Sequence, residues 1–245
     1  MTTSNIGIIT QARATSTRLP AKVLLRAGGR TFLEHHLDRL ARTGLPVIVA
    51  TTTNADDEPI VDLAGEAGVP VFRGSELDVL SRFAGAAREH ELDAVVRVTS
   101  DCPLIDAEVV AAGVDRYRAE DDELLYVSNC LERTYPRGMD YEVFSVPQLL
   151  RAEALATLPA DREHVTSYLH QNRGGDVRLL NLPWQGGGSQ YRLTLDTEDD
   201  RLLLTALIED HAASTLNCAE LVAIMDAHPE LAALNAHIEQ KKLGE

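Results

Sequence analysis

The fold of this chain is decided by IGIITQARATSTRLPAK, residues 6 to 22. Its first four residues, Ile6 to Ile9, form an apolar run of the kind that makes a buried strand. Thr31 and Glu34 have the spacing of a capping box, so a helix begins after Thr31. About twenty residues connect the strand to this helix, although two to six would suffice. We therefore expect the long loop to bind a ligand.

The loop is the cationic part of an acidic chain. The sequence has a formal net charge of −15, yet residues 1 to 33 contain no Asp or Glu. The cations of that segment are Arg13, Arg18, Lys22, Arg26 and Arg30. A broadly acidic surface repels nucleic acid and anionic lipid, whereas a local group of cations can bind a small polyanion. We predict a polyphosphate ligand and no nucleic-acid or membrane partner.

The composition is that of a globular protein. Apolar residues make up 44% of the 245 residues and charged residues 25%, which suits one large α/β domain. No stretch approaches the roughly 18 apolar residues that span a bilayer, and no secretion signal is evident, so we expect a cytoplasmic location. Cys102, Cys130 and Cys218 form no CxxC pair, which argues against a disulfide framework and a structural zinc site.

Apolar runs and amphipathic segments alternate after the first helix. The patterns predict strands at residues 46–51, 69–72 and 93–99. They predict helices at residues 56–67, 75–91 and 106–117. This alternation is typical of a mostly parallel sheet with helices on both faces, in which ligands bind at the carboxyl ends of the strands. We therefore predict an α/β, Rossmann-like fold in a single domain over residues 1–245.

The second half of the chain is less regular. Residues 124–128 are strand-like, and a segment rich in Pro, Gly and Arg predicts an irregular insertion at about residues 126–146. The elements predicted beyond it are a strand at 191–195 and helices at 147–155, 161–172, 198–211 and 219–237.

Two aspartates follow predicted strands. Asp101 comes after the strand at 93–99, and Asp196 directly follows the strand at 191–195. Both would therefore face the ligand crevice at the carboxyl ends of the strands. Because Mg²⁺ prefers a few carboxylates together with phosphate oxygens and water, the pair is a candidate metal site beside the loop. Either aspartate could instead cap a helix.

Several other chemistries are disfavoured. The loop matches neither GxxxxGK[ST] nor GxGxxG, which argues against a P-loop nucleoside triphosphatase and a nicotinamide-binding Rossmann enzyme. A solvated basic surface is the alternative for the loop itself. Arg97 lies inside an apolar strand and must be paired or face a ligand, because a buried unpaired guanidinium is very costly. Cys102 has no evident His partner, so we expect a small packed residue there.

Six segments in order resemble the motif series of a known enzyme family. They are QARATSTRLPAKVL, FRGSELDVLSRF, RVTSDCPLIDAEVV, SNCLERTYPRGMDYEVF, REHVTSYL and YRLTLDTEDD. The series is similar to that of cytidylyltransferases of the spore coat polysaccharide biosynthesis protein F type. These are relatives of acylneuraminate and 3-deoxy-manno-octulosonate cytidylyltransferases. The resemblance covers roughly residues 5–210 and implies the nucleotidyltransferase form of the Rossmann-like fold.

The resemblance also implies roles for individual residues. CTP would be bound by Ala12, Arg13, Ser16, Arg18, Lys22, Ala50, Thr51, Arg73 and Asp101. Within that set the catalytic residues would be Arg13, Lys22 and Asp101, and Mg²⁺ would be held by Asp101 and Asp196. The acceptor would be contacted by Asn129, Arg137, Asp140, Glu142, Arg162, Glu163 and His164.

The acceptor residues have structural alternatives. Asp140 and Glu142 could equally cap local turns. Arg162 and Glu163 could form a surface pair, which would contribute little to stability. His164 is a candidate base, although a lone His on a helix is more often structural.

The implied activity is transfer of CMP from CTP to an acceptor, with an acidic sugar favoured and pyrophosphate released. Sialic-acid-activating relatives often carry D-x-D where this chain has Thr194, Leu195 and Asp196, which weakens the case for a sialic acid. A phosphonate or other non-sugar acceptor and a catalytically silent CTP-binding protein stay open. A glycosyltransferase is disfavoured because it usually needs a D-x-D motif.

The resemblance further suggests a homodimer formed through the insertion. Its apolar surface would come from Tyr135, Met139, Tyr141 and Phe144, although these side chains could instead be core.

Overall fold

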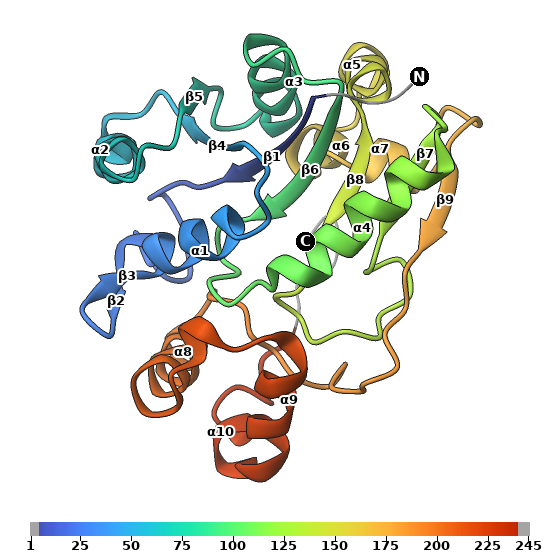
Figure 1. Ribbon diagram of the computed structural model, residues 1–245. Helices are drawn as coiled ribbons and strands as arrows, with labels where there is room; N and C mark the ends of the chain where they lie inside the picture. The colour runs from blue at the N-terminus through green and yellow to red at the C-terminus, as the bar shows by residue number, and fades with distance from the viewer. Residues whose placement is uncertain (1–4, 240–245) are drawn as a thin grey trace.

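Among residues 5–239, the part of the chain that this computed structural model describes, seven strands form one sheet in the order β5-β4-β1-β6-β8-β7-β9 (Figure 1). They are β1 (Ile6–Gln11), β4 (Val47–Thr52), β5 (Val71–Gly74), β6 (Ala94–Thr99), β7 (Leu125–Ser128), β8 (Glu142–Ser145) and β9 (Arg178–Asn181). β8 runs antiparallel to β6 and β7, and the other neighbours are parallel. The predicted α/β fold with a mostly parallel sheet is confirmed.

Helices cover both faces of the sheet (Figure 1). One face packs against α1 (Phe32–Ala41), α2 (Glu58–Glu66) and α4 (Ala107–Glu120). The other packs against α3 (Val79–Glu89), α5 (Val146–Leu155) and α7 (Ser167–His170), with α6 (Pro159–His164) beside α3. A third apolar cluster joins the start of α1 and the segments that hold Leu104 and Met139 to α8 (Glu198–His211) and α9 (Cys218–Ala227), with α10 (Pro229–Ala233) alongside.

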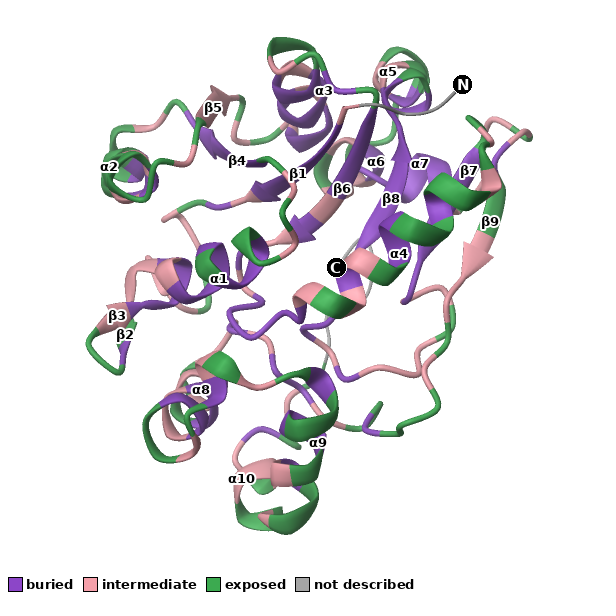
Figure 2. Ribbon diagram, viewed as in Figure 1, coloured by how far each residue is buried: buried purple, intermediate pink, exposed green. Residues whose placement is uncertain are grey.

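The central strands are buried on both sides. Ile8 and Ile9 are neighbours in β1 that belong to the clusters on opposite faces, and both are 0% exposed. Figure 2 shows the same burial along β4, β6 and β8. A strand covered on both faces needs apolar residues at successive positions rather than at alternate ones, which explains the unbroken run that predicted β1.

The long connection after β1 is folded into short elements. It contains a 3₁₀ turn, η1 (Lys22–Leu24), and a small hairpin of β2 (Arg26–Ala27) and β3 (Arg30–Thr31). The predicted capping box is confirmed, because Thr31 Oγ1 accepts from Glu34 N at 3.1 Å and Glu34 Oε2 accepts from Thr31 N at 2.6 Å. The helix predicted at residues 198–211 is also confirmed as α8.

The strand predicted at residues 191–195 is wrong. This segment lies outside the sheet and makes one isolated bridge, between Arg137 and Arg192. Its apolar alternation has another cause, since Leu193 and Leu195 are 0% exposed within the cluster formed by α8 and α9. Leu195 N nevertheless donates to Asp101 O at 2.7 Å, which fastens the segment to the end of β6.

Two predicted helices are interrupted. The helix predicted at 161–172 divides into α6 and α7 at Val165, which has a φ of 61°. Val165 lies at the centre of a tight turn in which Thr166 N donates to His164 O at 2.6 Å. The one at 219–237 breaks before Pro229. β8 falls within the segment predicted as an irregular insertion, and β9 was not predicted. No helix among residues 5–239 has the length and apolar character needed to cross a membrane.

Candidate active site

The cationic loop folds over the carboxyl ends of β1 and β6. Lys22 Nζ lies 3.1 Å from Asp101 Oδ2 and 3.1 Å from Asp196 Oδ1, so one ammonium joins both aspartates. Arg18 forms a second ion pair with Asp196. Four of the residues predicted from the sequence thus meet at one point.

The ionised state of Asp101 is favoured at this point. Burial acts to raise the pKa of Asp101, but the charge of Lys22 and hydrogen bonds from Thr99 and Lys22 outweigh it and lower the pKa to about 2. Because a carboxylate with so low a pKa stays charged at neutral pH, Asp101 presents a negative charge for a cation to bind.

The backbone positions Asp101 at the end of β6. Ser100 N donates to Gln11 O in β1 at 3.2 Å, and Cys102 N donates to Thr99 O at 3.2 Å, which turns the chain sharply. The bond from Leu195 N to Asp101 O then ties this turn to the residue that precedes Asp196. The two carboxylates are therefore held together by main-chain contacts as well as by Lys22.

Asp196 is oriented by a buried aspartate that the sequence reasoning missed. Asp200 is 0% exposed, and its Oδ2 accepts from Asp196 N at 3.0 Å and from Thr197 N at 3.1 Å. Arg192 Nε donates to Asp200 Oδ1 at 2.9 Å, and Asn235 Nδ2 donates to the same atom at 2.8 Å. Nothing in the sequence marked Asp200 for this role, because Arg192 and Asn235 meet it only in the folded chain.

A second missed carboxylate fixes the start of the loop. Asp57 ends the 3₁₀ turn η2 (Ala55–Asp57) and is 0% exposed. Its Oδ1 accepts from Ala14 N at 2.7 Å, and its Oδ2 accepts from Thr51 Oγ1 at 3.0 Å and Thr52 N at 3.1 Å. Burial acts to raise the pKa of Asp57, but hydrogen bonds from Thr52, Ala14 and Thr51 lower it overall. This buried anion pins the loop to the end of β4.

Replacing Asp57 by Asn is therefore expected to lower the free energy of unfolding by about 2–3 kcal/mol, because an amide nitrogen cannot accept the bonds made at Oδ2. Since folding lowers the pKa of Asp57, its stabilisation is present above its unfolded pKa and is lost as pH falls through the folded value. The difference between wild type and D57N should therefore shrink below about pH 4. Thermal and urea unfolding of both proteins at several pH values measures this difference in the free energy of unfolding. The control is the exposed neighbour, D56N, and equal stability of D57N and D56N would contradict the assignment.

Glu76 holds the next part of the loop from the connection between β5 and α3. Its Oε1 accepts from Thr15 Oγ1 at 2.5 Å and lies 3.4 Å from Arg13 NH1, while Oε2 accepts from Asn54 Nδ2 at 2.7 Å. Arg13, which is 43% exposed, thus lies among the loop residues but pairs with Glu76 rather than with Asp101 or Asp196. Its predicted catalytic role stays a prediction.

Three residues predicted to bind CTP, Ala50, Thr51 and Arg73, lie in the carboxyl-terminal halves of β4 and β5. Ala50 and Thr51 are both 0% exposed. The Arg73 guanidinium donates to Thr52 O at 2.9 Å and to Asn54 O at 3.0 Å, so it supports the chain that leaves β4. An open cavity of about 590 Å³ lies next to this region. Its lining residues are Ala14, Thr15, Ser16, Pro20, Ala21, Leu24, Ala55, Asp56 and Pro59.

Two of the predicted acceptor residues are buried beside the antiparallel strand. Asn129 is 1% exposed and bonds Met139 O at 2.7 Å and Tyr141 N at 3.1 Å. Glu142 pairs with Arg97 at 2.5 Å, which confirms that Arg97 is paired. Both side chains hold the fold in this structure, and their contact with an acceptor stays a prediction.

The remaining acceptor candidates differ in their surroundings. Asp140 forms a two-bond ion pair with Arg133, at 2.8 Å for each bond, and Arg162 pairs with Asp78 at the start of α3. Burial lowers the pKa of Arg137, whose backbone bridges to residues 191–193. Glu163 is exposed at the end of α6, and His164 precedes the tight turn at Val165.

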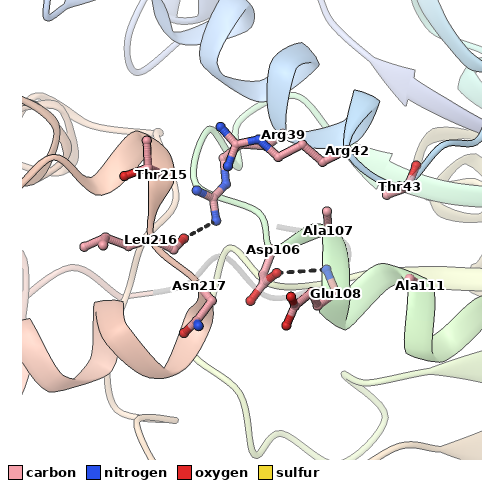
Figure 3. A pocket seen from close by; sticks show the side chains of 10 residues that line it. All are labelled: Arg39, Arg42, Thr43, Asp106, Ala107, Glu108, Ala111, Thr215, Leu216 and Asn217. Carbon is pink, nitrogen blue, oxygen red and sulfur yellow. Dashed lines mark hydrogen bonds between the residues drawn. The ribbon is translucent and has the colours of Figure 1, made fainter.

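A smaller pocket of about 240 Å³ lies between α1, α4 and α9, and Figure 3 shows its side chains. Arg39 is 2% exposed and donates to the carbonyls of Ile105 and Leu216. Asp106 caps α4 through Glu108 N at 2.9 Å and accepts from Cys218 N at 2.7 Å. These contacts join three helices, and none of the residues predicted for the active site lines this pocket.

The two aspartates at Lys22 suit a divalent cation. Carboxylate oxygens are the ligands that Mg²⁺ prefers, and one oxygen from each aspartate lies 3.1 Å from the same nitrogen, so both reach a single cation. Across residues 5–239, no group of three or more His, Cys, Asp and Glu side chains is arranged to hold a metal ion. Phosphate oxygens and water would have to supply the other ligands.

The chain matches a protein-family model and is similar to known proteins and solved structures. The model, described as Cytidylyltransferase, matches residues 7–200. The spore coat polysaccharide biosynthesis protein SpsF of Bacillus subtilis is 28% identical over 238 residues, 94% of this chain and 97% of that protein. A 3-deoxy-manno-octulosonate cytidylyltransferase of Solibacter usitatus is 33% identical over 123 residues, 49% of this chain and 47% of that protein. A solved cytidylyltransferase from Leptospira borgpetersenii has a TM-score of 0.89 and 32% identity, covering 97% of this chain and 99% of that one.

Proposed function

Because this chain belongs to the cytidylyltransferase family, we propose that it transfers CMP from CTP to an acidic sugar with release of pyrophosphate. The observation that carries the proposal is the position of Lys22, whose ammonium lies 3.1 Å from each of Asp101 and Asp196. A cation between two carboxylates is the arrangement expected where a triphosphate and a divalent metal ion bind together.

The triphosphate would be bound by the loop. Arg13, Arg18 and Lys22 are available to exchange their carboxylate partners for phosphate oxygens, Arg as a two-bond fork and Lys as a point charge. Asp57 and Glu76 would hold the loop backbone and the Thr15 side chain in place while this exchange occurs. These contacts restrict the loop, and a loop that is held in place loses less conformational entropy when a ligand binds.

We propose Mg²⁺ as the cofactor, held by Asp101 and Asp196, where it would neutralise phosphate charge. The acceptor hydroxyl would pass its proton to a base, for which His164 is the candidate, and its oxygen would attack the α-phosphorus in line. One phosphorus–oxygen bond would form, and the bond to the β-phosphate would break to release pyrophosphate. No covalent enzyme intermediate is required. Lys22 and Arg13 would stabilise the charge that develops on the α-phosphate and the departing pyrophosphate, the dominant effect in phosphoryl-type transfer.

The acidic-sugar acceptor is supported by the relatives. One is named for 3-deoxy-manno-octulosonate and another for spore coat polysaccharide biosynthesis. The residues proposed to contact the acceptor are Asn129, Arg137, Asp140, Glu142, Arg162, Glu163 and His164. A phosphonate or other non-sugar acceptor is the second candidate, and a silent CTP-binding protein is the third. A homodimer, which light scattering would test, and a cytoplasmic location stay predictions. Met139 and Phe144 are 0% exposed and Tyr141 is 2% exposed, so these side chains are core and do not supply the apolar surface expected for a dimer contact.

An acceptor screen distinguishes these candidates. The enzyme is incubated with CTP, Mg²⁺ and either a panel of sugar acids or a panel of phosphonates, and pyrophosphate is measured. We expect release that depends on a sugar acid. Pyrophosphate release with phosphonates only would mean that the acceptor is a phosphonate and not a sugar acid. CTP binding without pyrophosphate release under any condition would indicate a silent CTP-binding protein.

A further inference from the structure

A buried histidine on α1 contacts the turn that carries Asp101. His36 is 0% exposed, and its Nδ1 lies 2.8 Å from Cys102 O. Its Nε2 lies 2.8 Å from Thr10 Oγ1 in β1, which in turn lies 2.9 Å from Ser100 Oγ. The contacts of His36 thus reach both neighbours of Asp101, one directly and one through Thr10.

The chemistry of the partners fixes the direction of each hydrogen bond. A carbonyl oxygen can only accept, so Nδ1 of His36 carries the hydrogen and donates to Cys102 O. Nε2 then accepts from the Thr10 hydroxyl, which leaves Thr10 Oγ1 free to accept from Ser100. Burial lowers the pKa of His36 to about 4, in agreement with a neutral ring at physiological pH. Every polar atom in this chain of contacts is satisfied.

Resting on the proposed function, we propose that His36 is a positioning residue, which fixes the Ser100–Cys102 turn against β1 so that Asp101 faces Lys22 and Asp196. Asp101 needs this support because it lies in a turn beyond the last residue of β6, and 29% of its side chain is exposed. A displacement of about 1 Å at a reacting centre can lower turnover by about 100-fold.

The neighbouring histidine supplies a matched control. His35 is also buried, at 4% exposed, and also makes two contacts. Its Nε2 lies 3.0 Å from Ala27 O and its Nδ1 lies 3.0 Å from Ser214 Oγ, both far along the chain from Asp101. Loss of either histidine removes a buried, hydrogen-bonded ring from the same helix, but only His36 contacts the turn.

The kinetic test compares H36L, H36Q, T10V and H35L. We expect kcat of H36L to fall by about 100-fold with little change in the KM for CTP. T10V should show a smaller fall, because it removes only the link to Ser100, and H36Q should recover much of the activity, because an amide can both donate to Cys102 O and accept from Thr10. H35L should retain kcat within about threefold of wild type even if it melts at a lower temperature. Equal kcat losses in H35L and H36L, scaling with stability, would overturn the proposal.

A structural measurement keeps this inference separate from the proposed function. Crystal structures of wild type and H36Q or H36L should show residues 100–102 displaced in the leucine variant and in place in the glutamine variant. If H36L does not fold, T10V takes its place in the comparison. An unmoved turn in both variants would reject the positioning role. If wild type turns over no acceptor, the proposed function fails, and the crystallographic comparison alone decides the role of His36.

Discussion

Replacement of Lys22 by Ala is expected to lower kcat by about 10²–10³-fold while the protein stays folded. The Lys22 ammonium lies 3.1 Å from both Asp101 and Asp196, so it is placed to meet phosphate oxygens at the same point. Its removal would leave the developing charge of the transition state without its nearest cation. Steady-state pyrophosphate release measures the loss, and circular dichroism establishes that the variant is folded.

Arg26 provides the control for Lys22. It belongs to the same acid-free segment, but it is exposed in the β2–β3 hairpin and donates to Gly29 O at 2.7 Å. R26A removes one positive charge from this segment without touching the two aspartates, so its kcat should stay within about twofold of wild type. Comparable losses of kcat in K22A and R26A would mean that this segment acts only through its overall positive charge. Near-normal turnover of K22A would remove Lys22 from the mechanism.

Replacement of Asp196 by Asn is the second large effect. We expect kcat to fall by about 100-fold and the Mg²⁺ concentration for half-maximal activity to rise, because one of two carboxylates that can bind the metal loses its charge. The variant should fold, since the buried anchor Asp200 still receives the backbone bonds of residues 196 and 197. Magnesium titrations of pyrophosphate release, together with Mn²⁺ binding in the presence of CTP, measure the change.

Asp199 supplies the matched control for this variant. It lies three residues further on, has a side chain that is 42% exposed, and has a contact at 3.2 Å with His237. D199N removes the same charge from the same segment and should leave both kcat and the magnesium requirement unchanged. An unaltered magnesium requirement in D196N would show that Asp196 does not hold the metal.

The elements that were predicted correctly have an apolar pattern or a helix cap that can be seen in the sequence. β1, β4 and β6 carry apolar residues on both faces, and α1 and α8 have clear caps. The strand predicted at 191–195 failed because Leu193 and Leu195 alternate for a different partner, the α8 and α9 cluster. β8 was not predicted, because this antiparallel strand lies within a segment whose Pro and Gly residues suggested irregular structure.

The residues of the candidate active site also divide into those that could be predicted from the sequence and those that could not. Lys22 and Asp101 could be selected in advance because the charge of the loop and the end of β6 are visible in the sequence, whereas Asp196 was selected as the residue after a predicted strand at 191–195 that lies outside the sheet. Asp57, Asp200 and His36 could not, since each works through backbone or hydroxyl groups from other segments. Only the folded chain brings those partners together, and an isolated Asp or His has no pattern that separates such a role from an ordinary cap or core residue.

Product analysis tests the central claim most directly. The protein is incubated with CTP, Mg²⁺ and the sugar acid that gives the highest pyrophosphate signal, and the products are followed by phosphorus NMR and mass spectrometry. The account predicts one pyrophosphate and one CMP-linked sugar for each acceptor consumed, with both products reduced together in K22A. Hydrolysis of CTP without a CMP-linked product, or CTP binding without pyrophosphate, would contradict it.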